Sequence, residues 1–286
     1  KKEDIMTTKL LWRNLESILG NKINEFEGVA GLSIRSLKNK NTLSINGDDI
    51  FPTASSIKIH ILTQLFSLEE KGMIDLSKRI QFTQDMYGAG SGVIHFLEND
   101  PEFSILDIAI LMMLVSDNTA TNMCIDLAGM EETNNLIKGF GLSKTKLGRK
   151  MMDADANNRG EENISTPNEL TTMMELLYQK KPSAKVSENV LSIMSKPKSA
   201  YLNKAVGPNV KVANKPGGMD KVRCDVGIVF LPNNPYSISI MTNYGILDSL
   251  AQEAFIIEIA KTVHKFMLTL DQTNEFGLGL PSTIPL

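Results

Sequence analysis

The stretch Phe51-Pro52-Thr53-Ala54-Ser55-Ser56-Ile57-Lys58-Ile59-His60 is where a polar, turn-forming segment gives way to a strongly apolar one. The apolar run continues to Phe66 and stops before Gly72, a residue that can take the left-handed conformation at a helix C-terminus. We therefore expect a buried helix with Ser55 in its first turn. Lys58 follows three residues later, so the two side chains should lie on one helical face.

A serine hydroxyl becomes a useful nucleophile only when a nearby group takes its proton. A lysine that is buried, or held beside another cation, is neutral often enough to do so. Backbone N–H groups at a helix N-terminus can also stabilise a developing oxyanion. Ser55 is therefore the candidate nucleophile and Lys58 the candidate base. A capping serine beside a lysine whose stem covers apolar surface fits the same pattern, which recurs at Ser143–Lys146 and Ser195–Lys198.

Composition bounds the partners of the chain. Its 286 residues are 42% hydrophobic and 22% charged, with a net charge of −3, which suits one large domain or two interleaved ones. The lysines are scattered among acidic residues, so the sequence predicts no nucleic-acid partner. The longest apolar stretch, residues 108–115, is too short to cross a bilayer, so we expect no membrane span.

The cysteines and histidines suggest neither a metal nor a cofactor. Cys124 and Cys224 are far apart without metal-like spacing, and we expect buried free thiols in preference to a disulfide. His60, His95 and His264 have no patterned Asp partner and no ligand spacing. We expect them to be packed or surface residues.

Hydrophobic periodicity outlines the elements. A helical period predicts helices over residues 5–19, 104–115, 119–128, 166–178 and 248–267, with a short one starting at Ser187. Thr166-Pro167-Asn168-Glu169 predicts a capping box with proline at the first helical position, and Asp248 should cap the last helix. Alternation predicts strands over residues 29–34, 42–45, 210–215, 225–231 and 236–244. The glycine-rich residues 87–92 lack the context of a phosphate-binding loop and predict a flexible loop.

This order predicts an α/β sandwich, in which an antiparallel sheet flanked by the terminal helices carries a large inserted all-helical domain. We expect residues 1–54 and 208–270 to form the sheet domain, and residues 55–207 the helical domain. The helical part contains a long polar loop, residues 147–167, of the kind that is usually functional. Residues 271–286 should be a loosely held tail. A site at the seam would draw residues from both domains.

Three motifs in order carry a resemblance: Ser55-Ser56-Ile57-Lys58, Ser116-Asp117-Asn118 and Lys215-Pro216-Gly217. They resemble the Ser-x-x-Lys, Ser-Asp-Asn and Lys-Thr-Gly motifs of class A β-lactamases and penicillin-binding proteins. Phe-Pro before the serine, Thr-Ala after Ser-Asp-Asn and Thr-Pro closing the long loop match the same family. The resemblance covers nearly the whole chain and implies that family's sandwich fold.

The resemblance implies a role for each motif residue. Ser55 would attack a β-lactam or a D-alanyl carbonyl of a peptidoglycan-type peptide, with Lys58 and Ser116 relaying its proton. Further implied roles are substrate binding by Asn118, Gly217 and Gly218, positive charge from Lys215, and an oxyanion hole formed by the N–H groups of Ser55 and Gly218. Asp117 should cap the turn that aims its neighbours. The resemblance also implies a periplasmic or secreted protein, and we expect a monomer.

Two departures qualify these roles. Pro216 stands where the family has Thr, so a hydroxyl that would help to hold a substrate carboxylate is missing; proline there suits an edge strand. Arg223 either compensates as a bidentate carboxylate partner or is a solvated strand-end arginine. Met151 stands where a class A β-lactamase carries its deacylating Glu. We expect surface positions for the carboxylates of the loop: Asp153, Asp155, Glu161 and Glu162.

Three hypotheses follow. The first is a serine hydrolase that is acylated at Ser55 faster than it is deacylated, because methionine cannot activate water. The second is a sensor or binding module that uses the acyl-enzyme as its signal. The third is a promiscuous esterase on the same scaffold.

Overall fold

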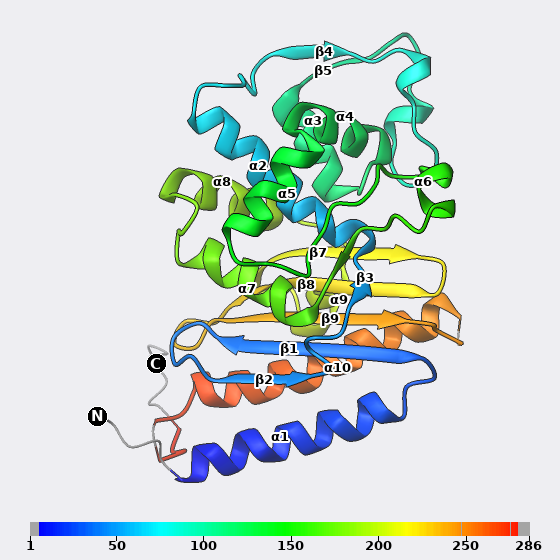
Figure 1. The fold of residues 1–286 in the computed structure, drawn as a ribbon. Coiled ribbons are helices and arrows are strands. Elements are labelled where there is room, and N and C mark those ends of the chain that lie inside the picture. The colour runs from blue at the N-terminus through cyan, green and yellow to red at the C-terminus, as the bar shows by residue number, and fades with distance from the viewer. Residues whose placement is uncertain (1–5, 247, 275, 280–286) are drawn as a thin grey trace.

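The structure is a computed structural model, which describes residues 6–246, 248–274 and 276–279. A five-stranded antiparallel sheet crosses the middle of the molecule in the order β2-β1-β9-β8-β7 (Figure 1). Its strands are β1 (Val29–Ser36), β2 (Thr42–Ile45), β7 (Lys211–Met219), β8 (Val222–Phe230) and β9 (Tyr236–Asn243). The predicted sheet from the two ends of the chain is confirmed, and β7, which contains Pro216, is an edge strand as expected.

The helices cover both faces of this sheet (Figure 1). On one face, a buried apolar cluster joins the sheet to α1 (Met6–Asn24), α9 (Tyr201–Val206) and α10 (Ser249–Asp271). On the other face, a second cluster joins it to the helical region. The helices there are α2 (Lys58–Glu70), α3 (Ile105–Leu114), α4 (Asn118–Ala128), α5 (Met130–Gly139), α6 (Ala154–Asn158), α7 (Pro167–Tyr178) and α8 (Ala184–Met194). The predicted fold class is confirmed, whereas the domain boundaries stay a prediction.

Several helix boundaries differ from those predicted. Helix α1 continues through Gly20 to Asn24, because burial of Ile23 outweighs the cost of about 1 kcal/mol for an interior glycine; the predicted start at residue 5 lies outside the described residues. Helix α8 starts at Ala184, and Ser187 is buried within it. Helices α5 and α9 were not predicted.

The long loop has more structure than its sequence indicated. It contains α6 and a short strand, β6 (Ile164–Ser165), which pairs with β3 (Phe51–Pro52). Beyond this pair, the N–H and hydroxyl of Thr53 both donate to the carbonyl of Asn163, at 2.8 and 3.0 Å. The end of the loop is therefore fastened to the residues that lead into Ser55. A second short ribbon, β4 (Arg79–Gln81) with β5 (Glu102–Ser104), lies at the far end of the helical region (Figure 1).

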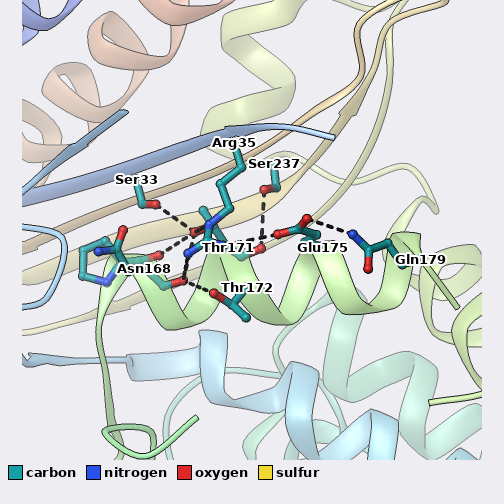
Figure 2. A network of polar contacts seen from close by, with 9 residues as sticks. Ser33, Arg35, Asn168, Thr171, Thr172, Glu175, Gln179 and Ser237 are labelled. Atoms are coloured by element: carbon teal, nitrogen blue, oxygen red, sulfur yellow. Dashed lines mark hydrogen bonds and ion pairs between the residues drawn. The ribbon is translucent and has the colours of Figure 1, made fainter. Parts of the chain in front are cut away.

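A polar network ties α7, the helix after the loop, to the sheet (Figure 2). Arg35 of β1 donates to the Thr171 hydroxyl at 3.1 Å and to the Asn168 carbonyl at 3.3 Å, and pairs with Glu175 at 3.2 Å. Ser33 shares a 2.8 Å hydrogen bond with the same threonine. These contacts fix the axis of α7 against β1, and with it the end of the loop.

The predicted capping box at the start of α7 is half formed. Thr166 accepts the Glu169 N–H at 3.1 Å, and Pro167 occupies the first helical position, as expected. The Glu169 carboxylate, however, accepts from Lys144 N at 2.9 Å and from the Thr145 hydroxyl at 2.6 Å. Glu169 therefore holds the chain that enters the loop, because that chain passes within reach in the folded molecule.

The predicted tail is held at its first residue. The Asp271 carboxylate, at the end of α10, accepts the N–H groups of Asn233 and Asn234 at 2.6 and 2.7 Å. Residues 275 and 280–286 of that predicted tail lie outside the described residues. Within the described part of the chain, no helix has the length and apolar character needed to span a bilayer.

His60 lies in the middle of buried α2 and neither ring nitrogen has a hydrogen-bond partner. Burial disfavours the imidazolium and lowers the pKa of His60 from 6.5 to about 4. The folded state therefore takes up a proton less readily than the unfolded state. The contribution of neutral His60 to the free energy of unfolding is therefore complete above pH 6.5 and is lost as the pH falls towards 4.

We predict that His60→Leu makes the fold less sensitive to acid. Between pH 7.5 and pH 5, the wild-type free energy of unfolding should fall by about 2 kcal/mol more than that of the variant. Urea unfolding at the two pH values measures this difference. Equal losses in the two proteins would show that His60 does not titrate as its burial requires.

Candidate active site

Ser55 belongs to a 3₁₀ turn, Ala54–Ile57, which leads directly into α2. In a 3₁₀ turn the side chains at i and i+3 eclipse, so Ser55 and Lys58 share a face, as predicted. The residue before the nucleophile, Ala54, has a φ of 44°. A non-glycine residue in this left-handed region carries strain of about 1 kcal/mol or more, which the surrounding packing must offset.

The hydroxyl of Ser116 is the meeting point of the predicted residues. It accepts from Lys58 Nζ at 3.0 Å and from Lys215 Nζ at 3.1 Å, and donates to Ser55 Oγ at 2.7 Å. Lys58 also donates to the Ser116 carbonyl at 2.9 Å. Among the described residues no hydrogen bond joins the Ser55 hydroxyl directly to the Lys58 amine. The contact between nucleophile and amine that the sequence suggested therefore runs through Ser116.

Both lysines of this cluster are buried. Burial lowers the pKa of Lys58 well below its usual value, and the charge of Lys215 lowers it further, against weaker opposition from Asp117 and Cys124. Burial also lowers the pKa of Lys215, to about 8. Near neutral pH the cluster can therefore contain a neutral Lys58 beside a protonated Lys215, which is the arrangement that a base and a charged donor require.

The turn between α3 and α4 places Ser116. Its φ of 56° lies in the left-handed region, and Asp117 behind it caps α4. The Asp117 carboxylate accepts three backbone N–H groups, from Val93, Ile94 and Ala120, at 2.6, 2.9 and 2.9 Å. Its predicted role in capping this turn is confirmed.

A cavity of about 430 Å³ opens over Ser55. Its walls contain Asn118 and Gly218, two of the predicted substrate-binding residues, and Met151 from the long loop. The other lining residues are Ala54, Gly90, Ser91, Arg149, Met152, Asp153, Ala154, Asn157, Glu162, Asn163, Met219 and Asp220. The side chain of Asn118 donates to the Ala89 carbonyl at 2.9 Å, so the glycine-rich loop is tied to this wall.

Gly217 and Gly218 are consecutive in β7, so a side chain added at each would lie on opposite faces of the sheet. A Cβ on Gly217 would lie 2.9 Å from Ser55 N, so only glycine lets the strand approach the nucleophile this closely. A Cβ on Gly218 would instead meet the side chain of Arg223, at 3.2 Å. At Gly217 the strand thus brings its backbone directly against Ser55.

Arg223 is not among the described residues that line the cavity. Its guanidinium donates to the carbonyls of Met219 and Val222, at 2.6 and 2.7 Å, and pairs with Glu253 of α10 at 3.5 Å. The structure therefore does not bring Arg223 to Ser55. The side chain is also not a solvated strand-end arginine, because it is largely buried. Arg223 lies on β8 directly opposite Gly218 of β7, and from this position its side chain extends towards α10.

The loop wall is rigidly connected. Asn122 binds the backbone of Met151 twice, accepting its N–H at 2.8 Å and donating to its carbonyl at 3.2 Å. Glu162 pairs with Arg149 at 2.9 Å, with both side chains largely buried. The expected surface position of Glu162 is therefore wrong, and Asp153 also lines the cavity while capping α6. Asp155 is exposed, as expected, and Glu161, which pairs with Arg159, is partly exposed.

Cys124 and Cys224 are free and buried, as predicted. Within the described ranges, no group of three His, Cys, Asp or Glu side chains could hold a metal ion. What the arrangement offers is a serine, a proton relay and backbone N–H groups beside a cavity.

We predict that Asp117→Ala destabilises the protein by about 3 kcal/mol, because three backbone N–H groups lose their acceptor and α4 loses its cap. Urea unfolding measures the loss. Asp107→Ala is the matched control: Asp107 is an exposed carboxylate in the first turn of α3, and its removal should cost at most about 1 kcal/mol. Similar losses in the two variants would contradict the role assigned to Asp117.

Comparison with known proteins gives a consistent result. A family model described as "Beta-lactamase enzyme family" matches residues 11–267. Beta-lactamase BRO-1 of Moraxella catarrhalis is 27% identical over 247 residues, which cover 81% of this chain and 75% of the relative. Beta-lactamase VEB-1 of Pseudomonas aeruginosa is 25% identical over 272 residues, covering 89% and 91%.

A solved structure supports the same grouping. The structure of PBP-A has a TM-score of 0.80 at 27% identity, covering 88% of this chain and 95% of its own. A mutant of PBP-A in which glutamate replaces a leucine was solved as an acyl-enzyme complex with penicillin G.

Proposed function

The chain belongs to the beta-lactamase enzyme family of serine hydrolases, and we propose that Ser55 is the residue that its substrates acylate. The observation that carries this proposal is the convergence of Lys58, Lys215 and Ser55 on the Ser116 hydroxyl. β-Lactams, or amides of the D-Ala-D-Ala type, are the acyl donors that we propose.

In the proposed acylation, Ser55 Oγ attacks the carbonyl carbon while its proton passes to Ser116, whose own proton passes to neutral Lys58. The N–H groups of Ser55 and Gly218 would hold the resulting oxyanion, each worth about 3–4 kcal/mol in enzymes where one such donor was removed. Lys58 then returns a proton through Ser116 to the leaving nitrogen. Protonated Lys215 donates to Ser116 throughout and offsets negative charge. Asn118, at the cavity wall, would bind the substrate's side-chain amide.

Hydrolysis of the acyl-enzyme needs a base that activates water. Met151 stands at the position where a class A β-lactamase carries the glutamate that serves as this base. Met151 lines the cavity, and its backbone is fixed by Asn122. The carboxylate of Glu162 is engaged with Arg149 and with the N–H of Asn163. We therefore propose that deacylation is slow relative to acylation. The periplasmic or secreted location and the monomeric state remain predictions.

An esterase acting on neutral substrates is the second candidate. Arg223 is bound on the other side of β7, and Pro216 supplies neither a hydroxyl nor an N–H for a substrate carboxylate. Three acidic residues line the cavity: Asp153, Glu162 and Asp220. Arg149 also lines it, but its charge is already paired with Glu162. A neutral ester would avoid this unfavourable charge balance.

We predict that brief exposure to penicillin leaves a persistent mass on Ser55, because acylation outruns hydrolysis. An intact-mass time course with peptide mapping measures it. Ser55→Ala should lose the label, whereas Ser143→Ala, at another Ser-x-x-Lys match, should keep it. Rapid turnover of a chromogenic cephalosporin without an adduct would refute slow deacylation. Turnover of a p-nitrophenyl ester that depends on Ser55, without β-lactam labelling, would favour the esterase.

We predict that Met151→Glu increases the rate of adduct loss by about tenfold or more, a part of the effect that a well-placed general base can have. The decay of the penicillin adduct, followed by mass, measures this rate. Met152→Glu is the matched control, since it adds the same charge one residue further along the cavity wall and should accelerate decay much less. An unchanged rate in Met151→Glu would show that the alignment of the loop is wrong.

A further inference from the structure

A buried carboxylate, Asp225 of β8, lies on the opposite face of the sheet from the Ser116 cluster. In the antiparallel register it stands opposite Pro216, the residue after Lys215. Both of its oxygens accept from the side chain of Asn214, the residue before Lys215, at 3.0 Å. One oxygen also accepts the Leu202 N–H of α9 at 2.9 Å. Its position is thus fixed by the residues on both sides of Lys215.

Lys215 needs such a neighbour, because its own hydrogen bonds supply no opposite charge. Its ammonium is buried and donates to two neutral oxygens, Ser116 Oγ at 3.1 Å and the Pro216 carbonyl at 3.0 Å. A buried ammonium without a counter-charge is strongly disfavoured and tends to lose its proton. The proposed catalytic cycle, however, requires Lys215 to stay charged.

The ionisable groups around Lys215 come from three parts of the chain. Lys58 approaches from α2 and shares Ser116 with it. Lys198, from the segment between α8 and α9, lowers the pKa of Lys215 below the value set by burial. Asp225 raises that pKa, and the Cys224 thiol of β8 does so more weakly. Burial raises the pKa of Asp225 to about 6, so the carboxylate is ionised when Lys215 titrates near 8.

We propose that Asp225 is a positioning residue that holds Lys215 in its protonated form from the far face of the sheet, while Lys58 on the near face stays neutral. The inference rests on the proposed roles of Lys58 and Lys215 and goes beyond them. It assigns a use to a buried acid that touches neither the substrate nor Ser55.

The proposal determines how acylation should depend on pH. Acylation needs neutral Lys58, which gives a lower limb, and protonated Lys215, which gives an upper limb. Removing the charge of Asp225 lowers the pKa of Lys215 and moves the upper limb to lower pH. The lower limb stays in place, because Lys215 is still protonated where Lys58 titrates.

Asp225→Asn tests this prediction with little change in shape, since the amide oxygen can still accept from Leu202. The rate of Ser55 labelling by penicillin, measured from pH 5 to 9, should show the upper limb lower by about one pH unit or more. At pH 8 this corresponds to a loss of about fivefold or more, with the rate at pH 6.5 nearly kept. Lys198→Met removes the opposing charge and should move the same limb upward, by less.

A second measurement does not depend on activity. NMR titration of ¹³C-labelled lysine should show the Lys215 signal changing at lower pH in Asp225→Asn and at higher pH in Lys198→Met. A uniform loss of labelling at every pH, or a Lys215 titration unchanged in both variants, would overturn the proposal. If Ser55 takes no label in the wild type, the proposed function fails, whereas the titration still decides the counter-charge. If Asp225→Asn does not fold, the direction of the shift in Lys198→Met decides it.

Discussion

The hydroxyl of Ser116 is the contact on which the site depends. Its oxygen accepts from two buried lysines and donates to the Ser55 hydroxyl, so all three of its hydrogen-bonding positions are used. Ser116 lies in the turn before α4. Ser55 and Lys58 come from the 3₁₀ turn and the start of α2, and Lys215 comes from an edge strand. The convergence therefore requires the helical region to be packed on the sheet, and the two apolar clusters on the faces of the sheet supply that packing.

In the cavity wall formed by the long loop, the two described carboxylates are both engaged: Asp153 caps α6 and Glu162 pairs with Arg149. Asn122 holds the Met151 backbone, Glu162 is paired with Arg149, and the Asn163 carbonyl joins the loop to Thr53. The proposed slow deacylation is thus attributed to the chemistry of one side chain and not to a loose loop. The same connections mean that a carboxylate introduced at that position would be held in a defined place.

Local sequence was sufficient wherever a feature depends on neighbours along the chain. Capping by Thr166 and Asp248 was predicted, because a side-chain oxygen reaches an N–H only two or three residues on. The shared face of Ser55 and Lys58 follows from helical spacing, and alternation gave the five strands of the sheet. The six residues of α9 are too few to give a periodic signal, whereas α5 was missed although Met130 and Ile137 recur at helical spacing.

The sequence by itself thus determined the sandwich and the edge position of Pro216, and it supplied Ser55 and Lys58 as the candidate nucleophile and base. Tertiary structure alone decided that Ser116 stands between Ser55 and Lys58, that Arg223 faces α10, and that Glu162 lines the cavity. The physical reason is that these features depend on strand register and on packing between distant segments. A shift of one residue in register turns a side chain to the other face of a sheet, and no local pattern records which face a charged residue takes.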